Sequence, residues 1–446
     1  MVTDRPRTEK AATAARRAAL AVLSLVSEGV PFDAALDRSI DSLEDRDRRL
    51  VHELAAGVLR QQTVLDDRLA PAVTRGLGAV DPRLLRVLRL GAYQLTVLDR
   101  VPAHAAVSTS VELAREAGGE PAAGFVNAVL RKLERGPVVE PEGPGSAAET
   151  GSRAAGLARR FSHPVWLVER WLARFGATET EALLRWNNTH PPLVVQPARE
   201  EQPALLSRWS SLGLDVRPAP WDAGIVVTAG SPRGLDGYQA GAFVVQDPAQ
   251  ALVARFAAVP PGALVYDACA SPGGKAIALG RRARLLVAGD GSRSRVRRLK
   301  QNLARAGSGR EHAVVADAKH PPLGSADVVL LDAPCLGTGT LARHPDARWR
   351  VRAAALRTLA HTQGRLLDAV AGTVRPGGLL IYATCSLEPE ENDTQVDRFL
   401  SRHPEFRRDL PADFPRELVT ADGDLQLLPH RHATDGAFAA RLRRAA

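Results

Sequence analysis

Apolar residues recur at helical spacing through the first third of the chain. Ala15, Ala18, Val22 and Val26 form one such series, and further series with steps of three, four or seven continue to about residue 135. This periodicity gathers apolar side chains on one face of each helix. We therefore predict an all-α bundle over residues 1–135.

The hydrophobic periodicity stops at residue 136. Residues 136–152 combine proline and glycine with few large apolar side chains. They can bury too little surface to offset the chain entropy lost on folding. We predict a flexible linker over residues 136–157.

A shorter mixed pattern follows the linker. Helical periodicity covers residues 165–175 and 179–187, and strand-like apolar runs occupy residues 193–196 and 225–227. Together these segments predict a small α+β module over residues 158–240.

From residue 241 onward, short apolar strands alternate with helical segments. This alternation is typical of a mainly parallel sheet with helices on both faces, so we predict an α/β domain over residues 241–446. The expected strands are residues 263–266, 285–288, 313–315, 328–331 and 379–382.

The charge balance indicates a polyanionic partner. The 446 residues, enough for two or three domains, include 59 Lys and Arg against 50 Asp and Glu, a formal net charge of +9. Such a balance suits RNA or DNA. Only five of the basic residues are lysines, and the planar arginine side chain suits phosphates and base stacking. A genome rich in arginine codons explains the same composition equally well.

No segment predicts membrane insertion. The longest apolar run near the N-terminus, residues 18–26, is interrupted by Ser24 and is too short to span a bilayer. The three cysteines lack the paired spacing of a disulfide framework, and no CxxC pair suggests a metal. We expect a cytoplasmic protein with no membrane partner and no metal.

All three cysteines lie in the predicted α/β domain. Cys269, Cys335 and Cys385 each follow an apolar strand that runs into a sharp turn. Open α/β sheets hold ligands and reacting groups at such turns. We expect the three thiols to face one crevice and to serve covalent chemistry beside a small-molecule cofactor. Taken singly, each is equally explained as a small buried apolar residue.

Acidic residues follow four successive strands of this domain. The first strand ends in the turn 267–275, which holds two consecutive glycines, and the next three end at Asp290, Asp317 and Asp332. Consecutive glycines let the backbone approach a ligand, and a carboxylate after the second strand can accept hydrogen bonds from ribose hydroxyls. We predict a nucleoside pocket, with helix capping as the simpler role for each aspartate. Because GxGxxG and GxxxxGK[ST] are absent, S-adenosylmethionine is favoured over NAD and ATP.

Three motifs together resemble RNA 5-methylcytosine methyltransferases of the RsmB/Sun family, also called Fmu. They are DACASPGGK, LLDAPCLGTG with RHPDARW after it, and YATCSLEPEEN. Two further segments that resemble the family are VVQDPAQAL and LLPHRHATDGAFAARL. Three upstream segments resemble the NusB-like helical domain of the family. They are VHELAAGVLRQQTVLD, LLRVLRLGAYQL and GFVNAVLRKL.

The resemblance covers nearly the whole chain and implies three parts. They are a NusB-like RNA-binding bundle, an RNA-binding middle module and a Rossmann-like class I methyltransferase domain. It also implies that S-adenosylmethionine binds the three aspartates and the first glycine turn. These residues are Cys269, Ala270, Ser271, Pro272, Gly273, Gly274, Lys275, Asp290, Asp317 and Asp332.

Four positions depart from the family pattern. Ser271 stands where alanine is usual, and Leu336 stands where serine is usual. Gln196 and Ala198 occupy positions where the middle module usually has Arg and Asn. The last pair leaves open how the middle module contacts RNA.

Cytosine methylation explains why two thiols are needed. Carbon 5 of cytosine is a poor nucleophile, so a thiolate first adds to carbon 6. The resemblance makes Cys385 this nucleophile, gives Cys335 a part in its release and places the cytosine edge on Asp332. A thiolate needs nearby positive charge, for which Lys275 is the candidate. DNA cytosine methyltransferases use a Pro-Cys pair like Pro334-Cys335 as nucleophile, which would reverse the thiol roles, and the Thr-Cys-Ser motif favours Cys385.

Two sets of basic residues are candidates for holding RNA. One set follows the Cys335 loop and is expected to line the path of a splayed-out base. It comprises Arg343, His344, Arg348 and Arg350. The other set is expected to form a phosphate-binding face on the helical domain. It comprises Arg60, Arg86, Arg89 and Arg131. For both sets an ordinary solvated surface is the alternative.

These features favour an S-adenosylmethionine-dependent RNA cytosine-C5 methyltransferase that acts on 16S ribosomal RNA as a monomer. A tRNA methyltransferase is the alternative within this class. The alternative from another class is a NusB-like RNA-binding assembly factor with an inactive methyltransferase domain. The presence of Asp332, Cys335 and Cys385 argues against an inactive domain.

Overall fold

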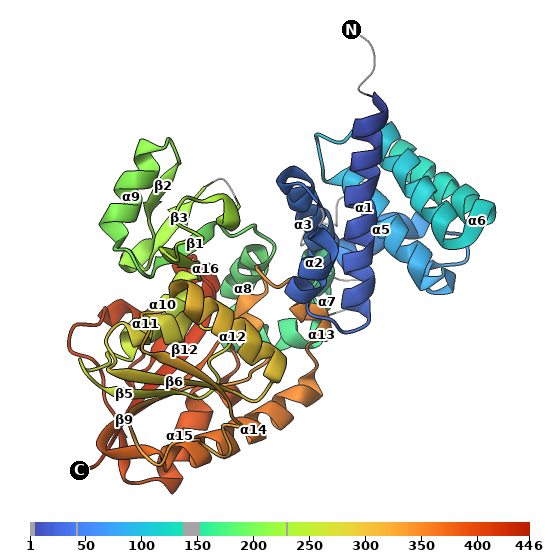
Figure 1. Cartoon of the computed structure of the whole chain (residues 1–446). Coiled ribbons are helices and arrows are strands. Elements are labelled where there is room, and N and C mark those ends of the chain that lie inside the picture. The colour runs from blue at the N-terminus through green and yellow to red at the C-terminus, as the bar shows by residue number, and fades with distance from the viewer. Residues whose placement is uncertain (1–4, 42, 137–151, 229–230) are drawn as a thin grey trace. The chain divides into compact units, whose positions relative to one another are not determined.

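The computed structural model describes residues 5–41, 43–136, 152–228 and 231–446, and the side chains from residue 13 onward. The chain forms two compact units (Figure 1). The helical unit comprises Met1–Thr189 and His344–Val351, and the sheet unit comprises His190–Arg343 and Arg352–Ala446. The domain boundaries expected from the sequence stay predictions, and most of the expected linker, residues 137–151, lies outside the described residues.

The helical unit confirms the predicted all-α bundle. Its chain order is α1 (Arg5–Ser27), α2 (Phe32–Ile40), α3 (Asp45–Arg60), α4 (Gln62–Leu69), α5 (Pro82–Thr96), α6 (Ala103–Arg135), α7 (Arg153–Phe161) and α8 (Val165–Asn187). Local sequence explains the start of α5, where the Asp81 carboxylate accepts the Arg83 N–H and Pro82 takes the first position. Glycines Gly119 and Gly176 have positive φ, and they interrupt α6 and α8.

Close packing in this core explains a glycine inside α3. A Cβ added to Gly57 would lie 2.0 Å from the Tyr93 ring. Tyr93 is buried, and its hydroxyl donates to the Glu53 carboxylate at 2.6 Å. Glycine at 57 destabilises α3 by about 1 kcal/mol relative to alanine, but it leaves the space that the Tyr93 ring fills in the core.

A short segment from the second half of the chain completes the helical unit. It contains α13 (Ala347–Arg350). The Arg348 side chain is fully buried and donates to the carbonyl oxygens of Arg60, Ser162 and Asn187 at 2.8–3.3 Å. Its guanidinium also donates to Asn188 Oδ1 at 2.7 Å. The prediction that Arg348 lines an RNA path is wrong, because the five-donor guanidinium is used to satisfy helix-end and loop carbonyls.

The predicted RNA-binding arginines of the bundle are also engaged within it. Arg60 is buried, and Arg89 forms an ion pair with Asp66 at 2.7 Å. Arg86 donates to Ser27 Oγ at 3.3 Å, and Arg131 pairs with Glu134 at 2.9 Å. A phosphate-binding role is therefore wrong for Arg60, and the structure gives no support for the other three.

The first sheet of the sheet unit confirms the predicted α+β module. Its strand order is β2-β3-β1-β4, with β1 (Leu193–Pro197) antiparallel to β3 (Ile225–Val227) and β4 (Phe243–Val245). The edge strand is β2 (Val216–Pro218). One helix, α9 (Gln202–Ser211), packs Leu205 and Trp209 into the module's core.

The second sheet has eight strands in the order β10-β12-β9-β8-β5-β6-β7, with β11 also paired to β12. The five strands predicted from the sequence are parallel neighbours: β5 (Leu264–Asp267), β6 (Leu285–Asp290), β7 (Glu311–Val315), β8 (Ala326–Asp332) and β9 (Val374–Thr384). The remaining strands are antiparallel: β10 (Phe406–Arg408), β11 (Leu425–Leu427) and β12 (Ala437–Arg444). This mixed sheet is the predicted α/β fold.

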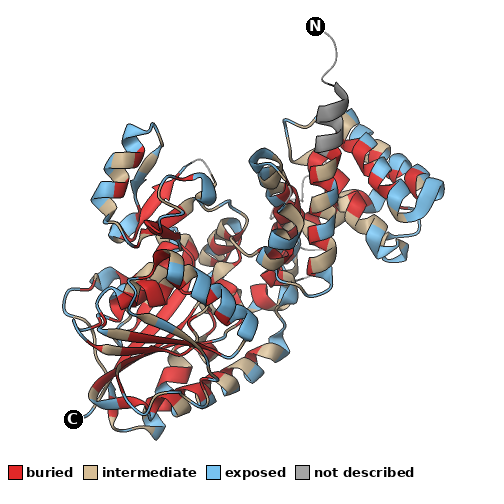
Figure 2. Ribbon diagram, in the orientation of Figure 1, coloured by how far each residue is buried: buried red, intermediate tan, exposed pale blue. Residues whose placement is uncertain are grey.

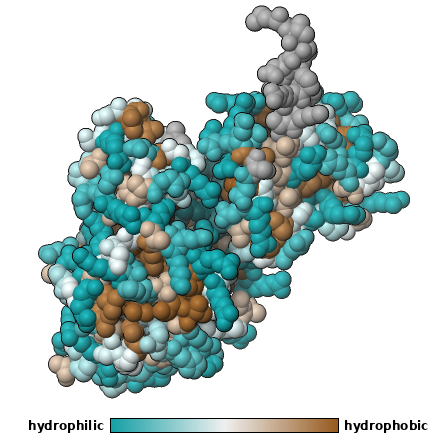
Figure 3. Space-filling model, in the orientation of Figure 1, coloured by the Kyte–Doolittle hydropathy of each residue, from teal (hydrophilic) through white to brown (hydrophobic). Residues whose placement is uncertain are grey.

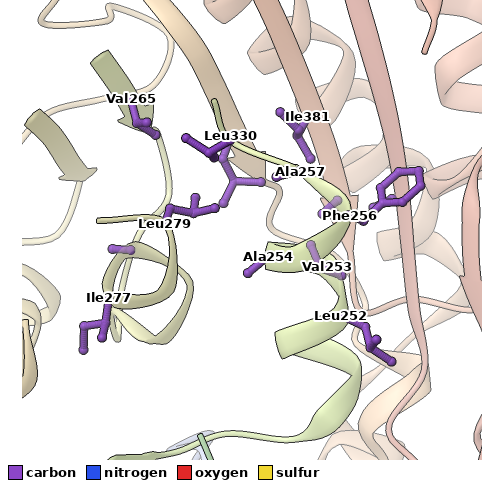
Figure 4. Packing of buried hydrophobic residues seen from close by; sticks show 14 of the residues in the cluster. Leu252, Val253, Ala254, Phe256, Ala257, Val265, Ile277, Leu279, Leu330 and Ile381 are labelled. Carbon is purple, nitrogen blue, oxygen red and sulfur yellow. The ribbon is translucent and has the colours of Figure 1, made fainter. Parts of the chain in front are cut away.

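Helices cover both faces of the second sheet. In β8, Val328 and Leu330 point to one cluster, whereas Val329 and Leu331 point to another, the alternation that two buried faces require. The first cluster lies under α10 (Pro248–Phe256), α11 (Gly274–Gly280) and α12 (Arg293–Ala306). The second lies under α14 (Ala353–Ala371) and α15 (Asp393–Arg402). Figure 4 shows side chains of α10 beside Leu330 and Ile381, and Figure 2 shows the strands of this sheet largely buried. The last helix is α16 (Pro429–His432).

Hydrophilic residues cover most of the surface in view in Figure 3, and hydrophobic ones gather over the strands of the second sheet. Among the described helices, none combines the length and the hydropathy needed to cross a bilayer. The described side chains also include no group of three His, Cys, Asp or Glu placed to hold a metal ion. The expected absence of a metal stays a prediction.

We expect Arg348→Met to destabilise the helical unit. The variant keeps much of the side-chain length but leaves three buried carbonyl oxygens without their donor, a loss of about 2–4 kcal/mol. Urea unfolding followed by circular dichroism measures the change. The matched control is Arg352→Met, at an exposed position, which should shift the transition by less than about 0.5 kcal/mol. Equal effects of the two variants would contradict the assignment.

Candidate active site

Four loops meet at one edge of the second sheet. Parallel strands β5, β6, β8 and β9 are adjacent in the sheet, so their carboxyl ends lie together. The loop after β5 leads into α11, whose first turn carries Lys275, and the loops after β8 and β9 carry Cys335 and Cys385. The topology therefore brings the predicted cofactor loop and both predicted reacting thiols to the same edge.

The loop after β5 turns sharply into α11. Gly273, at the helix start, has φ = 112°, and a Cβ there would lie 2.9 Å from Leu299 Cδ1. Asn302 of α12 donates to the Pro272 carbonyl at 2.8 Å. Glycine is needed at 273 because both the backbone conformation and the packing exclude a side chain. The predicted close turn at the helix start is confirmed in its geometry.

Asp267, the last residue of β5, is a buried carboxyl group. Its Oδ1 has no hydrogen-bond partner among the described residues, and its side chain is almost inaccessible. Burial, reinforced by the nearby charge of Asp332, raises the pKa of Asp267 to about 8. The sequence prediction started the cofactor site at Cys269 and omitted this residue. The signal that could have found it is its position, since it ends the first strand as Asp290 ends the second.

Asp290 and Asp317 have different surroundings. Asp290 is buried, and its carboxylate accepts the Ser292 N–H at 2.8 Å and Arg295 Nε at 2.9 Å. Asp317 lies two residues beyond the end of β7 with 56% of its side chain exposed, and it accepts the Lys319 N–H at 3.0 Å. Each carboxylate accepts the N–H of the residue two positions on, but neither is a helix N-cap, because Ser292 caps α12 and no helix lies among the described residues between β7 and β8.

Lys275 joins the β5 loop to the β8 loop. Its Nζ lies 2.8 Å from Asp332 Oδ2 and also donates to Gln250 Oε1. Burial lowers the pKa of Lys275, but the Asp332 carboxylate and a negative charge on Cys385 together raise it above the usual value. A lysine in this position stays charged. It therefore supplies positive charge within electrostatic reach of Cys385.

Cys335 and Cys385 come together in the site. Their Sγ atoms lie 3.4 Å apart. The two loops are joined by the Gly339 N–H donating to the Cys385 carbonyl at 3.0 Å, and by the Leu387 N–H donating to Thr338 Oγ1 at 2.8 Å. Gly337, at φ = 70°, leaves space beside the Cys385 sulfur, because a Cβ there would approach it to 3.8 Å. The predicted juxtaposition of these two thiols is confirmed by the geometry.

A fully buried carboxylate holds the Cys335 loop in place. Both Glu391 oxygens accept the Leu336 N–H at 3.1 and 3.2 Å. Gln363 Nε2 donates to Glu391 at 2.9 Å and also to the Pro334 carbonyl at 2.9 Å. Burial raises the pKa of Glu391. Sequence reasoning missed this residue, although it belongs to the quoted YATCSLEPEEN motif.

Glu391 also affects the thiol that it adjoins. The hydrogen bond with Cys385, burial and the Glu391 charge raise the pKa of Cys335 well above the usual value. These surroundings oppose ionisation of Cys335.

Cys269 occupies a separate environment. Burial and the carboxyl groups of Asp267, Asp332 and Asp290 raise its pKa to about 12. Its surroundings therefore oppose thiolate formation, and the structure places it among the acidic groups rather than in contact with the other two thiols.

Arg343, predicted to line the RNA path, and Gln196 and Ala198, which depart from the family pattern, are engaged or buried within the sheet unit. Arg343 pairs with Asp247 at 2.7 Å and with Asp435 at 3.4 Å. Gln196 is buried and donates to the Ala223 carbonyl at 2.8 Å, and Ala198 is also buried. In the helical unit, His344 lies 3.4 Å from Asp33, and Arg350 pairs with Asp346 at 2.8 Å. None of these side chains is a free cation aimed at RNA.

The carboxylates suit a ligand with hydroxyl groups and positive charge. Asp290 and Asp332 supply acceptors and negative charge at neighbouring strand ends, and the buried Asp267 carboxyl adds an oxygen, Oδ1, that has no partner among the described residues. S-adenosylmethionine carries two ribose hydroxyls, an amino group and a cationic sulfur, so the residues present fit it. A phosphate-bearing cofactor would meet charge repulsion here.

Three families match successive parts of the chain. "NusB family" matches residues 13–135, "Methyltr_RsmF/B-like, ferredoxin-like domain" matches residues 163–232, and "16S rRNA methyltransferase RsmB/F" matches residues 257–443. The predictions of a NusB-like bundle, a small middle module and a methyltransferase fold are thereby confirmed.

Curated proteins match over nearly their whole length. The Synechocystis protein named "Probable ribosomal RNA small subunit methyltransferase B" is 34% identical, over 93% of this chain and 95% of its own. The Vibrio cholerae protein named "Ribosomal RNA small subunit methyltransferase B" is 33% identical, over 95% of this chain and 96% of its own.

Solved structures share the fold. The crystal structure of PH0851 superposes with a TM-score of 0.82 at 25% identity, covering 97% of this chain and 99% of that one. The structure of NSun6 from Pyrococcus horikoshii with SFG has a TM-score of 0.56 at 19% identity, covering 62% of this chain and 97% of that one. The second likeness supports the fold of the sheet-containing part alone.

We expect Asp267 to make stability fall as pH rises. The carboxyl stays protonated in the folded chain up to about pH 8, whereas in the unfolded chain it ionises near pH 4. Its contribution is therefore full below about pH 4 and is lost as pH rises to about 8, with a slope of up to about 1.4 kcal/mol per pH unit.

Urea unfolding at pH 5, 6.5 and 8 tests this expectation. Asp267→Asn removes the titrating group. As pH rises, the unfolding free energy of the wild type should therefore fall relative to that of the variant. The control Asp317→Asn changes an exposed carboxylate and should track wild type. Parallel curves for wild type and Asp267→Asn would show that the carboxyl ionises normally.

Proposed function

The chain belongs to the RsmB/Sun family of ribosomal RNA small subunit methyltransferases, and from this premise we propose that it methylates carbon 5 of a cytosine in 16S ribosomal RNA. As a member of this family it is an RNA methyltransferase, and S-adenosylmethionine is its methyl donor. The target atom and the covalent route through Cys385 are our proposal. The observation that carries it is the 3.4 Å approach of two thiols beside a charged lysine.

We assign the cofactor to the edge formed by β5 and β6. Asp290 would accept the ribose hydroxyls, after Arg295 yields its place on the carboxylate, with Asp317 and the loop Cys269–Lys275 around the nucleoside. Asp267, buried and without a partner for Oδ1 among the described residues, supports this assignment as an additional acceptor. When bound, S-adenosylmethionine supplies an electrophilic methyl group on a positively charged sulfur.

Cys385 serves as the nucleophile in this scheme. Lys275 stabilises its thiolate, while the high pKa of Cys335 keeps the second thiol protonated. The thiolate adds to carbon 6 of the cytosine, and the electron pair of the ring moves toward carbon 5. Asp332, already within 2.8 Å of Lys275, binds the amino edge and stabilises the proton on ring nitrogen 3. Carbon 5 thereby becomes nucleophilic enough to accept the methyl group.

Cys335 serves in the release of the product. After methyl transfer, the hydrogen on carbon 5 leaves as a proton, and its electron pair re-forms the ring double bond as the Cys385 sulfur departs. The Cys335 thiol passes its own proton to the departing Cys385 sulfur and receives the carbon-5 proton in its place, so it acts as a proton relay and is a thiol again at the end of the step. Its position 3.4 Å from the Cys385 sulfur supports this division of roles.

We expect three cysteine variants to separate the roles. With S-adenosylmethionine and unmodified 16S RNA, Cys335→Ser should accumulate a covalent protein–RNA adduct because release is blocked. Cys385→Ser should form neither adduct nor 5-methylcytosine. Cys269→Ser removes the third thiol, which takes part in neither step. Because Cys269 stands in the proposed cofactor loop, this variant should raise the KM for S-adenosylmethionine but still release 5-methylcytosine without a trapped adduct. Denaturing gels detect the adduct, and sequencing detects the methylated base.

The outcomes discriminate between the alternatives. An adduct that persists in Cys385→Ser and is lost in Cys335→Ser would reverse the two thiol roles. If the wild-type protein methylates tRNA but not 16S RNA, the substrate is tRNA and not 16S ribosomal RNA. No methylation of either RNA would favour a binding factor with an inactive domain.

We expect Lys275→Met to make Cys385 less reactive. Without the ammonium group, the Cys385 sulfur loses the positive charge within electrostatic reach of it. In a background carrying Cys269→Ser and Cys335→Ser, alkylation of Cys385 by iodoacetamide at pH 7.5 should slow several-fold. Mass spectrometry follows the reaction. The same substitution at Lys319, outside the site, provides the control, and equal rates would exclude thiolate stabilisation by Lys275.

A further inference from the structure

Helix α12 carries an unusual concentration of positive charge. Its sequence RSRVRRLKQNLARA contains six basic residues and no acidic one within 14 residues. The whole chain is nearly balanced, with 59 basic and 50 acidic residues. General arginine richness therefore does not explain a helix that lacks acidic residues altogether.

Only two of the six cations have partners among the described residues. Arg295 pairs with Asp290, and Arg305 donates to the carbonyls of Tyr238 and Phe243 at 2.8 and 3.0 Å. The other four are exposed and have neither an ion pair nor a hydrogen bond within the described part of the chain. They are Arg293, Arg297, Arg298 and Lys300. Figure 2 shows the outward side of α12 as exposed.

The helix is amphipathic, so the free cations share one side. Val296, Leu299 and Leu303 are buried against the second sheet. At 100° per residue, Arg297 and Arg298 fall on the opposite side of the helix, and Arg293 and Lys300 lie on its flank. We call Arg293, Arg297, Arg298 and Lys300 the α12 basic face.

This arrangement does not serve the stability of the helix. Arg293 stands in the first turn, where the helix dipole disfavours a cation, and no acidic residue offsets it there. Arg293 and Arg297 are four residues apart, a spacing at which like charges destabilise a helix by about 0.2–0.5 kcal/mol. An anionic ligand would remove both penalties.

The α12 basic face begins at the active-site edge of the sheet. The helix follows Asp290 at the carboxyl end of β6, which is three strands from β9 in the order β9-β8-β5-β6. Strands lie about 4.8 Å apart, so the two ends are separated by about 14 Å. A nucleic-acid strand that rises about 3.4 Å per nucleotide spans this distance in about four nucleotides. RNA that presents a base to Cys385 can therefore place nearby phosphates on α12.

We propose that the α12 basic face binds the phosphate backbone of the RNA substrate a few nucleotides from the target cytosine. This inference rests on the proposed RNA methylation and adds to it the surface that holds the flanking strand. The contact is electrostatic and independent of base identity, because arginine and lysine on an exposed helix face meet phosphates rather than base edges. It supplies affinity and positioning, and the loops after β8 and β9 supply the chemistry.

The test compares two triple variants of the full chain. Arg293→Gln, Arg297→Gln and Arg298→Gln remove three charges from the α12 basic face. The matched control, Arg357→Gln, Arg365→Gln and Arg398→Gln, removes three exposed arginines from α14 and α15 on the opposite face of the same sheet. Methyl transfer to small-subunit RNA gives kcat and KM, and filter binding at 50–200 mM salt gives the salt dependence of the RNA Kd.

We expect the α12 variant to raise the KM for RNA at least several-fold while kcat at saturating RNA and the Kd for S-adenosylmethionine stay within twofold. The log–log salt slope should fall by about 2–3, since each lost phosphate contact removes about 0.7–0.9. The control variant should keep the wild-type slope.

Three results would overturn the proposal. If the two variants have equal salt slopes and equal KM values for RNA, the RNA strand binds a surface other than the α12 basic face. A loss of S-adenosylmethionine affinity in the α12 variant alone would mean that the helix acts through the cofactor site. A loss of kcat with unchanged KM would exclude a binding role. An inactive wild-type protein would instead reject the proposed function, so the two failures are distinguishable.

Discussion

The ion pair of Lys275 and Asp332 at 2.8 Å joins the first turn of α11 to the last residue of β8. Lys275 follows the predicted cofactor loop, and the loop after Asp332 leads directly to Cys335. The lysine is almost buried, so loss of either partner would leave a poorly solvated charge. This pair thus holds the predicted cofactor loop beside the loop that carries Cys335.

The 3.4 Å contact between Cys335 and Cys385 does not by itself distinguish the two thiols, whereas the charges around them differ. Cys385 lies within electrostatic reach of an ammonium group, whereas Cys335 lies near a buried carboxylate that also holds its loop. Negative charge is therefore opposed on Cys335. Two residues of the same type thus have different electrostatic surroundings, and the proposed division of roles rests on this difference.

The sequence was informative where structure follows from local pattern. The apolar runs that end at Asp267, Asp290 and Asp332 had the length and order expected of parallel strands. The two glycines after β5 correctly predicted a tight turn. It was uninformative where a side chain is defined by partners far along the chain. Arg348 reads as a surface cation but is surrounded by carbonyls of the helical unit. Glu391 reads as one of several surface acids, although it is completely buried.

Residues His344–Val351 belong to the helical unit although they lie late in the sequence, and this affects how the protein folds during its synthesis. Nascent chains fold from the N-terminus, and the bundle up to Thr189 leaves the ribosome well before Arg348 exists. Until then, the carbonyls of Arg60, Ser162 and Asn187 have only water as their donor. The bundle therefore reaches its final form only after most of the sheet unit, including Cys335, has been made.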